Sequence, residues 1–579
     1  MSENKRPDRV QKLLERKNKS QTVVKASLRK LLCLDDKEKA CELIEKRVIE
    51  CSKRTFNASL ALNLLAREWF NGKDNVNEVL VPEFWDVTFI RQLFLGVQCA
   101  KKPFKDIQRL VLEHPELFPK LDRSDGDRNI YSHAATRLST NIKNHLRLNL
   151  PKVIKRYIHL KVNDKDDQVN AIYQTFGWPS KGLTDRQYIE SRKVRVILGL
   201  EEEAELDSSW LKKDENLPNM LKLFVHVNRC LDQKLFNILP ICRIKPHFIT
   251  IDTSSMLPLL KEMGLIKTSD PKKVDCEALW ESFIKVSKVK TSRNTFTGTI
   301  DTDGLAINIH FERLKLSKNE KEVDLQGKRL LAIDPGRVNI FTIVEKKDSG
   351  EFKNYVLTKG HYYMASGITK AKKKTTAWNK SVKNELTALS LISPKSVDLN
   401  NFLDYLATVK VVQEKLWDTY LQRKWRDQTL RLYGGKKRTF SNFFNSLKLD
   451  TNTIVAFGSA KFAPTGKGEL SVPTTRAYKE LSYRCKTILI DEFRTSKVHW
   501  EDDTILQTVA KKKAKRDGYE SVRGLLWCCS TKFNKFVNRD INAAINIWRC
   551  GMMYPQRPES LKRTGQIKIV QRIGKIIPK

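Results

Sequence analysis

An apolar strand that ends in an aspartate and is broken at once by Pro335-Gly336 is the most constraining feature of this sequence. Leu330–Ile333 are consecutive apolar residues, a run typical of a buried strand, and Asp334 follows directly. Residues 339–344 read as a second strand, so the pattern predicts a hairpin with Asp334 beside its turn. A carboxylate leaving a buried strand needs a cation, a hydrogen-bond donor or a metal ion. The alternative interpretation is an aspartate that caps the turn.

Two other acids occupy comparable places far along the chain. A strand predicted over 487–492 ends on Asp491 and Glu492, and residue alternation places Glu492 on the same face as the apolar isoleucines. Asp540 lies at the start of a helix whose apolar positions recur at helical spacing. If the fold brings Asp334, Glu492 and Asp540 together, two Mg²⁺ ions would neutralise them. Taken alone, each acid also has a structural explanation, as for an acid at a helix N-terminus.

The charge of the chain restricts its partners. Its 579 residues include 107 Lys and Arg against 67 Asp and Glu, which gives a net charge of +40. Such a charge repels itself unless a polyanion neutralises it, and nucleic acid is the natural counterpart. A membrane surface is the rival partner, but no apolar run approaches the length of a membrane span. No secretory signal is visible, so the eleven cysteines are expected to be mostly free thiols.

The length predicts two to four domains, and the pattern changes several times along the chain. Helical periodicity dominates from about residue 35 to 236. Strand patterns then follow, and Asp303-Gly304 between two alternating runs predicts a β-hairpin over 296–311. A basic helical segment is predicted over 366–449, before further strands near 454–457 and 487–492.

Several cations and one tryptophan are candidates for contacts with nucleic acid. Most of them are interleaved with polar or aromatic residues on predicted helices, a composition that suits a helix face against phosphates. One follows shortly after Glu492. The candidates are Arg137, Lys143, Arg147, Trp425, Arg426, Lys436, Lys437, Arg438 and Arg494. The alternatives are a solvated basic face for the cations, core packing for the aromatic residue, and pairing with an acid for Arg494. The cluster 511–516 fits nuclear import or phosphate binding equally.

Three segments together resemble a known family: the hairpin around Asp334, the segment 491–497 and the block 539–547. They are similar to the transposon-encoded, RNA-guided nucleases of the TnpB family, to the related type V CRISPR effectors, and to the eukaryotic branch, the Fanzor proteins. The likeness covers about 295–548. Thr302-Asp303-Gly304 resembles Fanzor rather than bacterial TnpB.

The position of the middle acid also resembles Fanzor. In most of the family that acid lies on the strand equivalent to 454–457. Here this strand runs into Gly458, and no acid follows until Glu469. Fanzor proteins have a relocated glutamate that matches Glu492.

This resemblance implies a multidomain α/β, all-α and β architecture, with an RNase H-like RuvC nuclease domain, a β-barrel wedge domain and a helical recognition lobe. It implies Asp334, Glu492 and Asp540 as catalytic ligands of two Mg²⁺ ions. It also implies a guide RNA (omega RNA), a target DNA cut next to a short motif that the protein reads, and specificity from base pairing. The protein would be a monomer in a ribonucleoprotein, in the nucleus and not in a membrane.

The implied boundaries follow the chain in order. They are a basic disordered N-terminus (1–20), the first wedge strand (21–34), the helical lobe (35–236), the rest of the wedge domain (237–327), the first RuvC part (328–365), a basic helical insertion (366–449), the second RuvC part (450–494), a target-nucleic-acid-binding loop (495–537), and the last RuvC part with a basic tail (538–579).

One departure from the family concerns zinc. Its members usually carry paired CxxC motifs between the middle and last acids, but 498–502 contains no cysteine and Cys528-Cys529 lacks the spacing. Zinc is therefore doubtful, and the loop is expected to be held by Trp500, Leu525, Leu526 and Trp527. Two other functions stay open: a catalytically silent RNA-guided DNA-binding or transposition accessory protein, and a guide-independent, structure-selective nuclease.

Overall fold

The computed structural model divides the chain into two compact units. Unit 1 comprises residues 1–315 and 378–430, and unit 2 comprises residues 316–377 and 431–579. The structure describes residues 19–95, 104–118, 127–178, 185–201, 203–292, 294–314, 323–460, 462, 472–512, 519–530 and 532–563. Most of the predicted basic N-terminus, Glu469, most of the cluster 511–516 and the C-terminal tail from 564 lie outside the described residues.

Unit 1 contains an antiparallel sheet of four strands in the order β1-β4-β3-β2. The strands are β1 (Lys19–Ser27), β2 (Ile249–Asp252), β3 (Thr295–Thr302) and β4 (Ala306–Leu314). β1 pairs with β4 from Lys19 opposite Leu314 to Ser27 opposite Ala306, so the helices between them are an insertion into one sheet. The first strand is shorter than the predicted 21–34, because the short helix α2 (Leu28–Leu31) follows Ser27 and buries both of its leucines.

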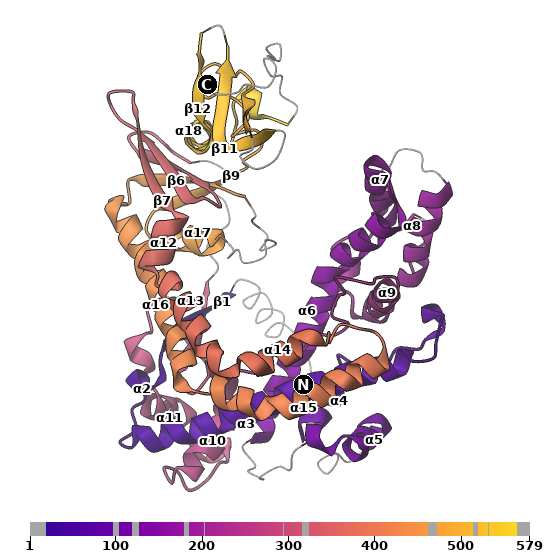
Figure 1. Cartoon of the computed structure of the whole chain (residues 1–579). Helices are drawn as coiled ribbons and strands as arrows, with labels where there is room; N and C mark the ends of the chain where they lie inside the picture. The colour runs from indigo at the N-terminus through magenta and orange to yellow at the C-terminus, as the bar shows by residue number, and fades with distance from the viewer. Residues whose placement is uncertain are drawn as a thin grey trace, which may run out of the picture. The chain divides into compact units, whose positions relative to one another are not determined.

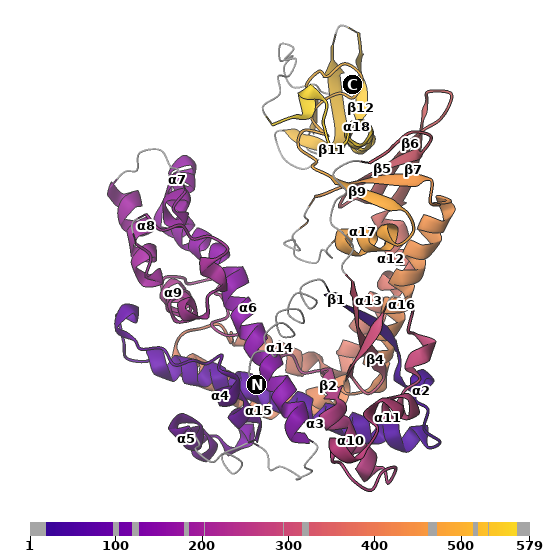
Figure 2. The ribbon, with the colours of Figure 1, turned by 180° about the vertical axis from the view of Figure 1, so that it is seen from behind.

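Helices fill the inserted segment, as the sequence predicts. They are α3 (Lys37–Phe70), α4 (Val87–Leu95), α5 (Lys105–Glu113), α6 (Asp127–Lys161), α7 (Lys165–Phe176), α8 (Asp185–Leu198) and α9 (Leu217–Arg229), with α10 (Thr253–Glu262) and α11 (Cys276–Phe283) after β2. The helices α7, α8 and α9 pack against α6 (Figures 1 and 2). No helix in the described part of the chain is long and apolar enough to cross a bilayer.

The β-hairpin predicted at Asp303-Gly304 is confirmed, and its turn is stabilised locally. The Asp303 carboxylate accepts hydrogen bonds from the backbone N–H groups of Leu305 (3.1 Å) and Ala306 (2.7 Å). Gly304 has a φ of +84°, a conformation that suits glycine. The buried guanidinium of Arg426 donates to the carbonyl of Asp303, which holds the turn against the start of α16 (Arg423–Ser446).

One buried arginine connects α3 to the later part of unit 1, which holds α14 (Lys383–Leu391) and α15 (Leu399–Tyr420). Arg67 is 1% exposed and donates to the carbonyls of Pro394 (2.7 Å) and Ser396 (2.8 Å). Its guanidinium also lies 3.9 Å from the centre of the Phe402 ring. Burial lowers the pKa of Arg67 to about 9. Arg67 therefore contributes to the attachment of the segment 378–430 to α3, beside apolar contacts such as that of Phe56 with Trp417.

Arg67→Ala should destabilise unit 1 by about 3 kcal/mol or more, because two carbonyls lose their donor and a cavity remains. Thermal unfolding followed by circular dichroism would show this as a midpoint lowered by several degrees. The matched control is Arg109→Ala, because Arg109 pairs with Glu68 and Glu113 near the surface and such pairs contribute less than about 1 kcal/mol. Equal midpoints for the two variants would contradict the anchoring role.

Unit 2 is organised around a mixed sheet of five strands in the order β7-β6-β5-β8-β9. The strands are β5 (Arg329–Pro335), β6 (Asn339–Lys346), β7 (Phe352–Thr358), β8 (Thr453–Gly458) and β9 (Lys486–Ile490). The first three are antiparallel neighbours, which confirms the hairpin predicted at Asp334, and β8 and β9 run parallel to β5.

Helices cover both faces of this sheet. One face packs against α12 (Lys359–Ala365), α16 and α17 (Thr474–Ser482), through apolar residues such as Tyr362, Phe444 and Leu481. The other face packs against α18 (Arg539–Met552), the helix predicted from 538. Gly551 allows the close approach of α18, since a Cβ there would lie 2.9 Å from the Cβ of Ala456. The sheet core thus fixes where both ends of α18 lie.

The predicted loop 495–537 contains a small antiparallel sheet in the order β10-β11-β12. Its strands are β10 (Gln507–Lys512), β11 (Tyr519–Cys529) and β12 (Asn534–Asn538). Its apolar core is Leu506, Cys528 and Val537, with Leu526 packed against it as predicted. The prediction for Trp500 was wrong, because Trp500 packs against Phe352 at the five-stranded sheet instead.

Candidate functional site: an acidic cavity in unit 2

The three predicted acids lie in one cavity of unit 2. Asp334 is the penultimate residue of the strand β5, Glu492 lies two residues after β9, and Asp540 is the second residue of α18. All three line a cavity of about 720 Å³. The carboxyl ends of parallel strands meet at the same edge of a sheet, which explains how β5 and β9 bring two of the acids together. The structure therefore assembles side chains that are 158 (492 − 334) and 48 (540 − 492) residues apart.

The carboxylate of Glu492 lies over the end of β8. Its Oε1 accepts a hydrogen bond of 2.9 Å from the backbone N–H of Ala460, just after that strand. A Cβ built on Gly458 would collide with Oε1 of Glu492 and lie 2.9 Å from its Cδ. The absent side chain of Gly458 thus leaves the space that the Glu492 carboxylate occupies.

The neighbouring acid, Asp491, points to a different environment. Its carboxylate pairs with Arg563 (3.0 Å) and Arg557 (3.4 Å), and it does not line the cavity. The strand β9 ends at Ile490, so neither acid belongs to it. The two side chains nevertheless face different surroundings, as predicted. Glu492 is therefore the acid of this pair that faces the cavity.

Asp540 is placed by the start of α18. The side chain of Asn538 caps the helix, accepting from the backbone N–H groups of Asp540 and Ile541 (both 3.1 Å). The carboxylate of Asp540 accepts from Asn339 Nδ2 (3.2 Å) at the start of β6 and from Arg539 (2.9 Å). These contacts hold Asp540 next to the hairpin that carries Asp334.

Two buried asparagines connect α18 to the segment that follows Glu492. Asn542 Nδ2 donates to the carbonyls of Thr495 (3.1 Å) and Val498 (2.8 Å), and Asn546 Nδ2 donates to the same two carbonyls at 2.8 and 2.7 Å. Both asparagines are almost inaccessible to solvent. The segment after β9 and the start of α18 are consequently held as one rigid piece.

Asp334 does not ionise independently of the other two acids. Burial, then the charges of Glu492 and Asp540, raise the pKa of Asp334 well above its ordinary value, and Arg539 opposes this only in part. Burial also raises the pKa of Glu492 to about 6, although the Ala460 N–H acts in the other direction. Asp334 keeps some contact with solvent through the cavity, while protein surrounds it on nearly every other side. A set of hard carboxylate oxygens in this state fits divalent cations such as Mg²⁺.

Sequence reasoning missed most of the other residues that line the cavity. Arg337 and Arg523 line it with Arg539, and all three side chains are exposed. Arginine is suited to bidentate contacts with phosphate oxygens. The only sequence signal for Arg337 is its place directly after Pro335-Gly336, and nothing in the sequence of β11 indicates that Arg523 reaches this cavity.

The predicted nucleic-acid residues of α6 are engaged within unit 1. Arg137 bonds to the Phe248 carbonyl and pairs with Asp301 (2.9 Å). Lys143 (2.6 Å) and Arg147 (2.5 Å) both pair with Asp214. These pairs stabilise the packing of α6, and a role in contacting nucleic acid stays a prediction.

The candidates near α16 fall into two groups. Trp425 and Arg426 belong to unit 1: the Trp425 indole donates to the Thr419 carbonyl (2.8 Å), and Arg426 is 5% exposed and pairs with Glu45. Lys436 is half-buried in unit 2, where burial lowers its pKa, whereas Lys437 and Arg438 are exposed. Arg494 is half-buried, has a φ of +60°, and lies 4.9 Å from the Phe493 ring centre.

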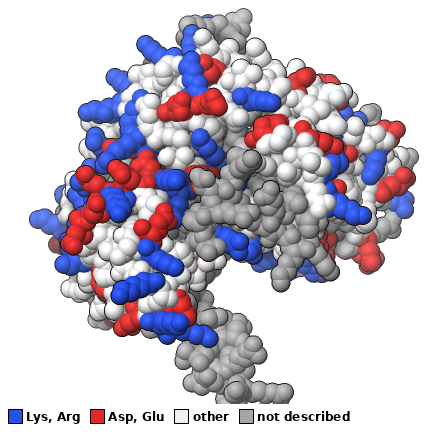
Figure 3. All heavy atoms as spheres, turned by 90° about the horizontal axis from the view of Figure 1, so that it is seen from below, with Lys and Arg blue, Asp and Glu red and all other residues white. Residues whose placement is uncertain are grey.

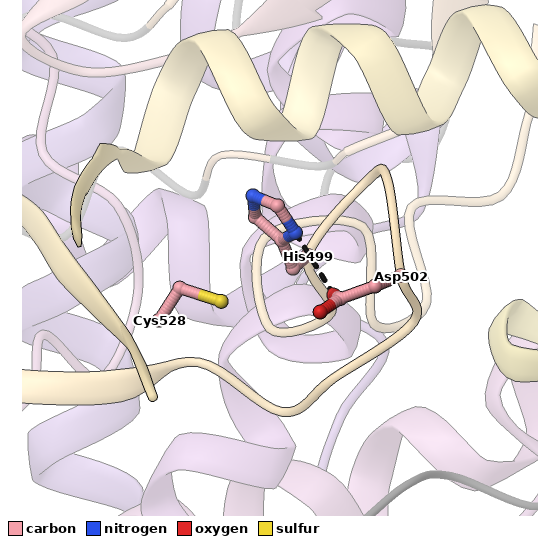
Figure 4. A group of neighbouring side chains, drawn as sticks. All are labelled: His499, Asp502 and Cys528. Carbon is pink, nitrogen blue, oxygen red and sulfur yellow. Dashed lines mark hydrogen bonds and ion pairs between the residues drawn. The ribbon is translucent and has the colours of Figure 1, made fainter. Parts of the chain in front are cut away.

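A second group of side chains in unit 2 is a possible metal-binding group. His499, Asp502 and Cys528 offer one nitrogen, one oxygen and one sulfur atom, all within 4.8 Å of one another (Figure 4). His499 Nδ1 bonds to Asp502 (2.9 Å), and the buried Nε2 has no partner among the described residues. Burial acts to raise the pKa of Asp502, but hydrogen bonds from Ser530, Thr504 and His499 lower it to about 2.

This group draws on the two places where the family's paired cysteines were expected, 498–502 and Cys528-Cys529. A structural zinc site has four tetrahedral ligands, and the group supplies three. Cys529 does not complete it, because its sulfur accepts from Gln507 Nε2 (3.1 Å) instead. Zinc therefore stays doubtful.

Comparison with known proteins adds nothing to these geometric observations. No protein-family model matches the chain, and no match was found among curated proteins. The resemblance noted in the sequence therefore remains a prediction, and the acidic cavity is the feature of the structure that bears on function.

The raised pKa of Glu492 predicts a pH-dependent cost to unit 2 in the absence of divalent cations. The folded state holds the proton more tightly than the unfolded chain, so this contribution to stability is complete below about 4.5 and is lost as the pH rises through about 6. Glu492→Gln cannot ionise. At pH 8 we expect the free energy of unfolding of this variant to exceed that of the wild type by about 1 kcal/mol, after allowance for partial exposure, with a correspondingly higher unfolding temperature. Near pH 4.5 we expect the variant and the wild type to unfold at the same temperature.

The measurement is thermal unfolding in a chelating buffer from pH 4.5 to 8. The matched control is Glu351→Gln in the same unit, an exposed residue before β7 that should leave the pH profile unchanged. A Glu492→Gln variant no more stable than the wild type at pH 8 would show that the cavity does not strain this carboxylate.

Proposed function

We propose that this protein is an RNA-guided DNA endonuclease that hydrolyses phosphodiester bonds at the acidic cavity of unit 2 with Mg²⁺. The observation that carries the proposal is the convergence of Asp334, Glu492 and Asp540 on one cavity from three separate parts of the chain. A half-buried cluster of acids in which two charges oppose the ionisation of the third is unfavourable for stability, so it calls for a functional explanation.

The proposal includes an RNase H-like RuvC domain in unit 2. Its support is the strand order β7-β6-β5-β8-β9, with an acid on the central β5 and helices on both faces. A wedge domain in unit 1, interrupted by a helical recognition lobe, is supported by the pairing of β1 with β4 across the inserted helices. Closure of that sheet into a barrel belongs to the proposal.

Asp334, Glu492 and Asp540 would hold two Mg²⁺ ions, which supply charge neutralisation and a reactive hydroxide in phosphodiester hydrolysis when bound. The residues of the chain set up this chemistry. Asn339 and the Asn538 cap orient the Asp540 carboxylate, and the Ala460 N–H orients that of Glu492. Arg337 and Arg523 are placed to neutralise phosphates of a strand that enters the cavity.

The charge of the chain supports a polyanionic partner as large as a guide RNA with its target DNA. Figure 3 shows Lys and Arg side chains interspersed with Asp and Glu on one face. The net charge is +40 nevertheless, so many cations lack an acidic counterpart. Contacts of these cations with the phosphate backbone would hold an RNA–DNA duplex, while base pairing selects the target. A monomeric ribonucleoprotein in the nucleus completes the proposal.

Asp334→Ala, Glu492→Ala and Asp540→Ala should each abolish DNA cleavage, a loss of at least about 10³-fold, while guide RNA and target DNA still bind. Purified protein, any RNA that stays bound to it, and a target matched to that RNA are combined with Mg²⁺. Cutting is read on denaturing gels and binding by mobility shift. Glu351→Ala is the matched control. Undiminished cutting by the Asp334 variant would defeat the proposal, and cutting without any retained RNA would favour a guide-independent, structure-selective nuclease.

Position 458 at the end of β8 and position 492 after β9 should be interchangeable as sources of the middle carboxylate. Gly458→Ala alone is expected to displace Glu492 and abolish cleavage, because its Cβ would occupy the place of Oε1. Gly458→Asp combined with Glu492→Ala returns a carboxylate to the same place, and should recover cleavage above that of Glu492→Ala.

Gly360→Ala is the control for a glycine in unit 2, because a Cβ there meets no atom within 4 Å. The Mg²⁺-dependent rise in unfolding temperature provides a readout besides activity. A Gly458→Ala protein with wild-type cleavage would contradict the placement of Glu492 over β8.

A further inference from the structure

Unit 1 contains a second cavity, of about 660 Å³, that no part of the proposed nuclease chemistry uses. Its volume lies within the range of small-molecule pockets, about 300 to 1,000 Å³. It lies between the segment 242–248 before β2, the helices α14 and α15, and the first turns of α16, with Phe56 of α3. All of these residues belong to unit 1, so the cavity is a property of one compact unit.

The walls of this cavity are rich in aromatic rings. The rings that line it are those of Phe56, Phe248, Tyr405, Tyr420 and Trp425. Hydrogen bonds fix two of them: Tyr420 Oη donates to Asn379 (3.1 Å), and the Trp425 indole donates to the Thr419 carbonyl (2.8 Å). The two ring centres are 5.1 Å apart, and Trp378 packs on Trp425 from another direction (4.9 Å). Rigid rings of this kind form a surface for a flat, polarisable group.

Cationic side chains line the cavity, and another lies next to one of its rings. Arg243 and Lys245 line it and are exposed, while Lys25 lies 4.7 Å from the Phe248 ring centre. Among the described residues that line the cavity, the carboxylate is that of Asp303, which already accepts two backbone hydrogen bonds within its turn. The cavity therefore combines aromatic walls with excess positive charge at an accessible edge.

The less exposed polar groups of the lining favour a ligand that can accept hydrogen bonds. Arg426 is 5% exposed, lines the cavity, and its Nε has no partner among the described residues. Burial lowers the pKa of His247, another lining residue, to about 4, so its imidazole is neutral at pH 7. A buried donor without a partner is costly unless a ligand or water satisfies it.

We propose that this cavity is a binding pocket for one unstacked nucleotide of a single-stranded nucleic acid, with the base among the aromatic rings and its phosphate at Arg243 and Lys245. Stacking of a base on an aromatic side chain contributes about 1 to 3 kcal/mol and tolerates any sequence. A cation next to the stacked base neutralises the flanking phosphate. This proposal rests on the proposed function only for the source of the strand, which would be the guide RNA or the target DNA. It does not depend on any step of cleavage.

The test uses the full-length protein, freed of nucleic acid by nuclease treatment and a high-salt wash. The probes are single-stranded 12-nucleotide RNA and DNA of the same sequence, each with a central 5-iodouracil base, which crosslinks under ultraviolet light to an aromatic side chain that it contacts. Mass spectrometry of the crosslinked peptides should identify Phe248, Tyr420 or Trp425. The RNA and DNA arms show which strand the pocket accepts, and a crosslink there with either one supports the proposal.

Affinity provides the second readout. Arg243→Glu with Lys245→Glu should weaken binding of the same probe by at least 10-fold. The matched control is Lys105→Glu with Lys272→Glu, the same change of charge at exposed positions of unit 1 that do not line the cavity, with less than 3-fold loss. Tyr420→Leu keeps an apolar side chain and should reduce the crosslink, with an unchanged unfolding temperature showing that the fold is intact.

The proposal is overturned if crosslinks map only outside the cavity, or if the two charge-reversed pairs bind equally. Because the measurement needs neither Mg²⁺ nor cleavage, it separates this pocket from the proposed nuclease. Loss of cutting in Asp334→Ala with wild-type crosslinking would support both, and crosslinking in a protein that never cuts DNA would support the pocket alone.

Discussion

The burial of Asp334 beside the charges of Glu492 and Asp540 is the constraint on which the cavity of unit 2 depends. Burial and the charges of Glu492 and Asp540 raise the pKa of Asp334. The state in which all three acids are ionised is therefore unfavourable in free energy. The surrounding fold tolerates this strain because each acid is held by different elements. The central strand β5, the segment after β9 and the start of α18 are each fixed by hydrogen bonds or packing that do not involve the acids themselves.

The position of Glu492 shows how one carboxylate can be supplied by an alternative part of the chain. At the end of β8 there is only Gly458, and the carboxylate arrives from the neighbouring strand into the space that a side chain there would fill. The Ala460 N–H binds it, and Asn542 and Asn546 connect the following segment to α18. The geometry of the cavity therefore depends on backbone contacts that surround it as much as on the acids that line it.

The two units divide their buried charges differently. In unit 1 most buried cations stabilise the fold: Arg67 joins α3 to 394–396, and Arg426 holds the β3–β4 turn. In unit 2 the acids at the cavity are half-buried, and the charges of Glu492 and Asp540 oppose the ionisation of Asp334. The first arrangement builds a scaffold, and the second is the site at which we propose that divalent cations bind.

The sequence alone determined the local features: the Asp334 hairpin, the Asp303-Gly304 turn and the α18 helix. These follow from apolar periodicity and turn chemistry within a few residues. Tertiary structure decided what lies far apart in the chain, because only packing brings Gly458 against Glu492, Arg523 to the acidic cavity, or Arg426 to Glu45. It also joined His499 and Asp502 to Cys528, a group without any CxxC spacing to reveal it. Such contacts depend on distances in three dimensions between distant segments, and no pattern of neighbouring residues in the sequence specifies those distances.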